Sequence, residues 1–122
     1  MEKVPSEQLE AKVRKFEELR ASLAGVLQAI ADAERSLQEA KVVLEEIKKM
    51  PEGTDLYKQV GFVLVPVKRE ELEKELQDKI EEYELKLVKL KKMEEEYRSQ
   101  LDRLLKEIQR LSQGQGGIAL GG

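Results

Sequence analysis

The side chains of this chain that could do chemistry are carboxylates and amines, because the sequence holds no His and no Cys. The commonest general base, the thiol nucleophile and the usual zinc ligands are therefore missing. The carboxylate run Glu94 to Glu96 lacks the spacing of a calcium loop and is typical of a solvated helix face. The stretch "GQGG" from Gly114 follows a predicted helix and opens none, so it is no phosphate-binding loop. We predict no enzyme, no catalytic or metal site, and no cofactor.

Composition indicates long helices rather than a compact core. Of the 122 residues, 39% are charged and only 4% are aromatic, which is typical of a coiled coil rich in Glu, Lys and Leu. The net charge of −3, with both signs spread along the chain, predicts neither a nucleic-acid nor a membrane partner. With no Cys, no signal-peptide pattern and no apolar run of about 20 residues, we expect a cytoplasmic protein. Abundant Lys and Glu fit a thermophile.

Two long segments carry the heptad pattern that must form the framework of the molecule. The first has a candidate cap in Ser6 and stops at Pro51 and Gly53, which predicts a helix over about residues 6–50. The second predicts a helix over about residues 70–111. In both, seam residues recur at steps of three and four, as in a coiled coil. The seam positions are Phe16, Leu19, Leu23, Val26, Ile30, Ala33, Leu37, Ala40, Leu44 and Ile47, then Leu76, Ile80, Tyr83, Leu87, Leu90, Glu94, Tyr97, Leu101, Leu104, Ile108 and Leu111.

The two seams match each other when the helices run antiparallel. Setting Leu44 against Ile80 places the bulky Tyr83 opposite the small Ala40, as interdigitating layers require. Glu94 is the one polar seam residue, and we expect its carboxylate to reach solvent or to help fix the register. The short connection favours a helical hairpin within one chain over a zipper between two chains. The predicted fold class is mostly α, a long antiparallel two-helix coiled coil.

Between the helices lies a β-type stretch, at about residues 56–67. Gly61 and Phe62 separate two apolar runs, and a two-residue loop with Gly first suits a type II′ hairpin turn. Pro66 cannot donate to a ladder and belongs at an edge position. The apolar side chains lie on both faces, which a lone hairpin cannot bury. We predict that hairpins of several subunits assemble into an intersubunit β-barrel; the alternative is a hairpin folded over its own helix ends as a private core.

The stretch "LYKQVGFVLV", Leu56 to Val65, resembles the central signature Y-K-x-V-G-x-x-x-V of β-type prefoldin subunits. Prefoldin is the ATP-independent holdase of archaea and eukaryotes. The signature lies between two heptad helices, as in that family, and the likeness runs from about Ser6 to Leu111. One hairpin rather than two resembles the β type and not the α type. The resemblance implies a single prefoldin-like domain over residues 1–122.

The resemblance also implies partners and a mechanism. It implies a hexamer of two α-type and four β-type subunits, whose arms grip non-native client proteins and hand them to a group II chaperonin. The family's assembly role passes to Leu56, Tyr57, Val60, Gly61, Val63, Leu64 and Val65. This chain departs from the family pattern at Pro66 and at Lys68 to Glu71, where the family often has a Thr-rich strand end and a helix cap.

The arm tips are the start of the first helix and the end of the second. Val13, Leu27 and Leu105 lie off the seam there, so a two-helix arm leaves them exposed or partly covered. Fraying of the terminal turns would also open seam residues. We expect clients to contact the tip residues Leu9, Val13, Phe16, Leu105, Ile108 and Leu111, whose modest apolar surface suits weak, promiscuous holding. The alternative is ordinary surface Leu and Val with no role.

Two further alternatives stay open from sequence. A coiled-coil adaptor that tethers one folded partner would show the same helices, but it would ignore unfolded polypeptides. The glycine-rich tail, residues 112–122, is predicted to be flexible. Within it, Ile118 to Leu120 is either a small sticky element for a client or chaperonin, or an end with no role.

Overall fold

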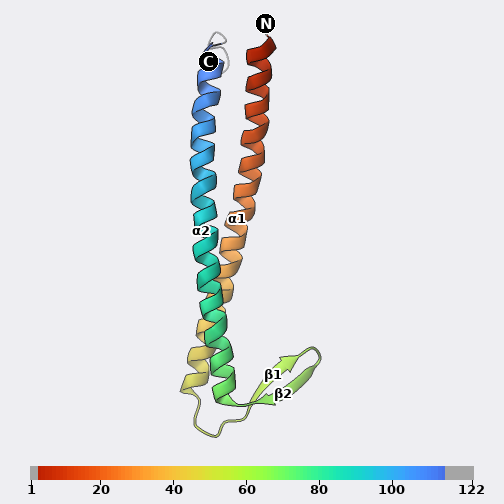
Figure 1. Cartoon of the computed structure of the whole chain (residues 1–122). Helices are drawn as coiled ribbons and strands as arrows, with labels where there is room; N and C mark the ends of the chain where they lie inside the picture. The colour runs from red at the N-terminus through yellow and green to blue at the C-terminus, as the bar shows by residue number, and fades with distance from the viewer. Residues whose placement is uncertain (1–2, 115–122) are drawn as a thin grey trace. The chain divides into compact units, whose positions relative to one another are not determined.

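The computed structural model describes residues 3–114, with side chains from Ser6 onward. Its elements follow in the order α1 (Lys3–Lys49), β1 (Leu56–Val60), β2 (Val63–Val67) and α2 (Arg69–Gly114) (Figure 1). The strands form one two-stranded antiparallel sheet. Two long helices with a single β-hairpin between them are the predicted fold class, which is thereby confirmed.

The described residues form two compact units. One combines residues 3–29 with 90–114, and the other is the continuous segment Ile30–Lys89. In both units the buried apolar side chains all lie on the seam, and the buried polar residue of the described chain is Ser112. The buried apolar side chains of the described chain are Leu19, Val26, Ile30, Ala33, Ala40, Leu44, Ile47, Ile80, Leu87 and Leu104.

In the unit Ile30–Lys89, the two helices share one apolar cluster. Ala40 and Leu44 of α1 pack with Ile80 of α2, and the half-buried Leu37 and Leu76 lie against them. Leu44 and Ile80 therefore meet in the core, as the heptad register predicts. The later part of α1 faces the earlier part of α2, so the two helices run antiparallel in this unit.

In the unit of residues 3–29 and 90–114, the same relation holds at the other ends of the helices. Leu19 of α1 and Leu104 of α2 are both buried and line one shallow cleft. The Lys12 Nζ lies 3.5 Å from a Glu107 carboxylate oxygen. This ion pair joins the start of α1 to the end of α2, as expected for antiparallel helices.

The helix ends differ from the sequence-based expectation. α1 begins at Lys3, so Ser6 lies inside the helix and not at its cap. Pro5 does not prevent this, because the first N–H groups of a helix have no partner within it. α2 begins at Arg69 with Glu70 and Glu71 in its first turn. Carboxylates there stabilise the helix, because they lie near the positive end of its dipole.

α2 also continues through Gly114, into the segment predicted as a flexible tail. Residues 112–114 are helical. The candidate sticky element Ile118 to Leu120 lies outside the described residues.

The connection after α1 is a tight turn. The Thr54 N–H and hydroxyl both donate to the Pro51 carbonyl, at 3.2 and 2.6 Å. Gly53 has a φ of +87°, which glycine adopts freely but which would strain the backbone of a residue with a side chain. This turn carries the chain from the end of α1 into β1.

Candidate functional site

The β-hairpin closes through the turn predicted from its sequence. Val60 pairs with Val63, which leaves Gly61 and Phe62 as a two-residue loop. Gly61 has a φ of +61°, and among the described residues 3–114 none other than glycine has a positive φ. A positive φ at the first loop position alone distinguishes type II′ from type I′. The register then runs without a bulge to Leu56 opposite Val67.

The hairpin has two faces of different composition. Side chains alternate along a strand, and directly paired residues share a face. Leu56, Lys58 and Val60 therefore lie on one face with their partners Val67, Val65 and Val63. The opposite face carries Tyr57, Gln59, Leu64 and Pro66. Both faces are thus largely apolar.

Most of this apolar surface is exposed within the single chain. The five side chains Tyr57, Val60, Val63, Leu64 and Val65 are between 41% and 65% exposed. Phe62, at the turn, is fully exposed, and only Leu56 and Val67 at the base are half-buried. The hairpin does not fold over its helix ends as a private core, so that alternative is wrong. Its predicted assembly residues lie together on one projecting element (Figure 1).

Two basic side chains, Lys58 and Arg69, make polar contacts near the hairpin. The Lys58 Nζ of β1 lies 2.7 Å from a Glu75 carboxylate oxygen of α2. Arg69, the first residue of α2, donates from its Nη2 to the Met50 carbonyl at 2.6 Å and to the Pro51 carbonyl at 3.2 Å. The guanidinium thus holds the two residues that follow α1, where the Pro51 carbonyl also accepts from Thr54. The first contact links the hairpin to α2, and the other two link the start of α2 to the residues that follow α1.

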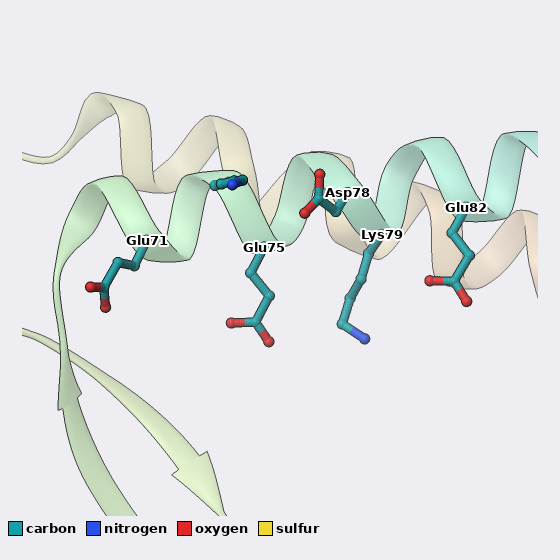
Figure 2. A pocket seen from close by; sticks show the side chains of 6 residues that line it. Glu71, Glu75, Asp78, Lys79 and Glu82 are labelled. Atoms are coloured by element: carbon teal, nitrogen blue, oxygen red, sulfur yellow. The ribbon is translucent and has the colours of Figure 1, made fainter.

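The α2 surface beside the hairpin is charged. Glu71, Lys74, Glu75, Asp78, Lys79 and Glu82 line an open groove of about 350 Å³. Figure 2 shows Glu71, Glu75, Lys79 and Glu82 projecting to one side of the helix. All come from one helix, and no group of three or more potential ligands within the described residues is arranged to bind a metal ion. The groove is a solvated helix face.

The predicted tip residues lie in the unit of residues 3–29 and 90–114, and they fall into two classes. Val13 and Leu105, off the seam, are 40% and 41% exposed. The other four residues of the set are half-buried; they are Leu9, Phe16, Ile108 and Leu111. Leu27, also off the seam, is exposed as expected. The apolar surface of this unit is modest and interrupted by charge.

Sequence reasoning missed several exposed apolar side chains elsewhere on the helices. They are Val42, Val43, Leu85, Val88 and Met93. The signal was available, because each lies off the heptad seam in the way that Val13 and Leu105 do. Exposed apolar side chains are thus not confined to the predicted tips, which calls for a matched control in any test of those tips.

None of the described helices has an apolar stretch long enough to cross a membrane.

Comparison with known proteins gives the family of this hairpin and its helices. The model of the prefoldin subunit family matches residues 10–115. The chain belongs to the prefoldin subunit family. The prefoldin subunit beta of Archaeoglobus fulgidus is 33% identical over 110 residues, 90% of this chain and 95% of the relative. That of Pyrobaculum aerophilum is 35% identical over 106 residues, 86% of this chain and 84% of the relative.

A solved prefoldin structure shows the same fold. The crystal structure of the prefoldin beta subunit from Thermococcus strain KS-1 matches with a TM-score of 0.78 and 31% identity, covering 84% of this chain and 90% of that chain. The resemblance to β-type prefoldin subunits is thereby confirmed. Prefoldin subunits are chaperones and not enzymes, so the chain is a prefoldin-type chaperone subunit. The family implies hetero-oligomers with α-type subunits.

Proposed function

We propose that this chain is an ATP-independent holdase subunit that captures non-native proteins with its arm tips and delivers them to a group II chaperonin. Its hairpin joins those of other subunits, two of α type and four of β type, into β-barrels. The assembly contacts come from Leu56, Tyr57, Val60, Gly61, Val63, Leu64 and Val65. The client contacts come from Leu9, Val13, Phe16, Leu105, Ile108 and Leu111.

The observation that carries the proposal is the exposure of the hairpin. Apolar side chains stand free on both of its faces, and an uncovered strand of this kind pairs with other chains. Assembly multiplies the arms. One arm offers only partly exposed residues such as Val13 and Leu105, which bind weakly, whereas several arms on one polypeptide gain avidity without any new contact.

The test is suppression of aggregation without nucleotide. The chain, mixed with an α-type prefoldin subunit, is added below stoichiometry to several unrelated denatured proteins, and light scattering is followed. We expect protection of all of them. Protection of one protein only, with tight binding to its folded form, would favour a tethering adaptor and overturn the proposal.

A matched pair of double variants locates the client surface. Val13→Ser with Leu105→Ser changes one exposed residue on each helix in the predicted tips. Val43→Ser with Leu85→Ser changes the same residue types, also exposed and one per helix, in the other unit. We expect the first double variant to lose most of the protection and the second to keep it. Equal loss in both would contradict client capture at the tips.

A further inference from the structure

The two outer edges of the hairpin are not equivalent, and the reason begins at the turn. In a two-residue turn the Val63 N–H bonds to the Val60 carbonyl, so these residues form a hydrogen-bonded pair. Bonded and non-bonded pairs alternate along an antiparallel ladder. Residues of non-bonded pairs direct their N–H and C=O groups outward, away from the partner strand. In this register they are Gln59 with Leu64, and Tyr57 with Pro66.

Pro66 thus stands at an outward-facing position of β2. Its ring nitrogen carries no hydrogen, and the hairpin loses nothing by this because that position makes no bond within the ladder. The missing donor affects only a strand that pairs with the outer edge of β2. The outer edge of β1 offers complete donor and acceptor sets at Tyr57 and Gln59, whereas that of β2 offers one at Leu64 and only a carbonyl at Pro66. Pro66 therefore changes one edge only.

This asymmetry ranks the ways in which two copies can pair. When β1 meets β1 of a second copy about a two-fold axis, Tyr57 of each lies opposite Gln59 of the other, and every outward group finds a partner. When β1 meets β2, the missing Pro66 donor leaves a carbonyl of the partner strand without a hydrogen bond. When β2 meets β2, each copy contributes one such defect. The β1 edges make the complete contact.

The charge at the centre of the β1 contact is compatible with this pairing. Lys58 would lie opposite Lys58 of the second copy, and like charges directly opposite each other are unfavourable. Each Lys58, however, already has the carboxylate of Glu75 at 2.7 Å within its own chain. The ion pair offsets the ammonium charge and holds the side chain toward α2.

We propose that a second copy of this chain docks along the outer edge of β1, forming a four-stranded sheet with β2 at both of its outer edges. Pro66 makes this the one pairing between two copies in which every outward group is bonded. The inference rests on the proposed assembly through the hairpin, and it adds the edge that two copies of this chain share.

Amide hydrogen exchange tests the edge directly. The full chain, labelled with ¹⁵N, is measured by NMR at concentrations where light scattering shows monomer and where it shows dimer. We expect the Tyr57 and Gln59 amides to exchange at least about tenfold more slowly in the dimer, since hydrogen-bonded amides are protected, and the Leu64 amide to keep its rate. Slowing at Leu64 without slowing at Tyr57 and Gln59 would overturn the proposal, and so would a chain that stays monomeric.

Two proline variants provide a matched test. Gln59→Pro and Leu64→Pro each remove one outward donor at directly paired positions, one on each edge, and neither breaks a bond of the hairpin ladder. Gln59→Ala and Leu64→Ala control for the loss of the side chain, including the Gln59 amide bond to the Gly61 carbonyl at 3.2 Å. We expect Gln59→Pro to raise the dimer dissociation constant about ten- to a hundredfold over Gln59→Ala, because each of two copies loses a bond.

Leu64→Pro should stay within about threefold of Leu64→Ala, since the β2 edge makes no bond in this dimer. The reverse ranking would contradict docking at β1. The outcomes also separate this inference from the proposed function. If denatured clients are protected but amide exchange slows at the β2 edge instead of the β1 edge, only the docking edge is refuted. If exchange slows at the β1 edge but no client is protected, only the holdase role is refuted.

Discussion

The burial of the heptad seam predicts how differently two leucines on one helix contribute to stability. Leu87 lies on the seam of α2 and is 8% exposed, whereas Leu85, two residues earlier, is 57% exposed. Both belong to the unit Ile30–Lys89. Replacing each by Ala removes the same atoms from the same helix, so the difference between the two variants reports burial alone.

The expected magnitude follows from burial. Full burial of a Leu side chain is worth about 1.5–3 kcal/mol, and the cavity left by Leu→Ala in a core raises the cost to about 2–5 kcal/mol. A two-helix layer can relax around a missing side chain, so we expect Leu87→Ala to lower the free energy of unfolding by about 2–3 kcal/mol. Leu85→Ala should change it by about 0.5 kcal/mol or less, because Ala is also the better helix former.

The assay is urea unfolding followed by far-UV circular dichroism. The wild type and both variants are measured at one protein concentration, because the stability of an associating chain depends on it. An unchanged denaturant slope would show that the variants unfold as the wild type does. A loss of stability for Leu87→Ala no larger than that for Leu85→Ala would refute the seam assignment in this unit.

Three further predictions concern the hairpin, its base and one helix. A double-mutant cycle of Lys58→Ala and Glu75→Ala should give a coupling free energy below about 1 kcal/mol. This coupling should fall with added salt, because both side chains are more than a third exposed, at 44% and 36%. Gly61→Ala should destabilise the hairpin by about 1–2 kcal/mol in urea unfolding, because the φ of Gly61 is +61°. Gly25→Ala should instead raise the free energy of unfolding by about 0.5–1 kcal/mol, because a Cβ there meets nothing within 4 Å. Changes in the free energy of unfolding with the same sign for both variants would contradict this contrast. Arg69→Ala should cost about 1 kcal/mol and speed amide exchange at the end of α1, since its bonds to two carbonyls are lost; unchanged exchange there would show that the contact is not needed.

The candidate site was predictable from sequence because its signals are local. The loop Gly61-Phe62 specifies a type II′ turn, and alternation along ten paired strand residues then places apolar side chains on both faces. The exposed residues Val43 and Leu85 were open to the same reasoning as Val13 and Leu105, since distance from the seam is a property of spacing. Spacing shows that a side chain lies off the seam, but it does not show which of these exposed side chains a client contacts.

The sequence by itself determined the helices, their buried seam and the turn. Steps of three and four place side chains on one stripe of any helix, so which residues face the partner is settled by periodicity before the chain folds. The turn at Gly61 is equally local, since only glycine adopts its positive φ without strain.

Only the tertiary structure decided the contacts between elements. Glu75 has Lys79 four residues later, a spacing that favours an ion pair on a helix, yet its carboxylate bonds to Lys58 of β1. Arg69 likewise bonds to the carbonyls of Met50 and Pro51, just after α1. These partners lie 17 to 19 residues apart, and they meet only because the turn after α1 and the direction of the hairpin bring them together. Periodicity contains no information about that direction.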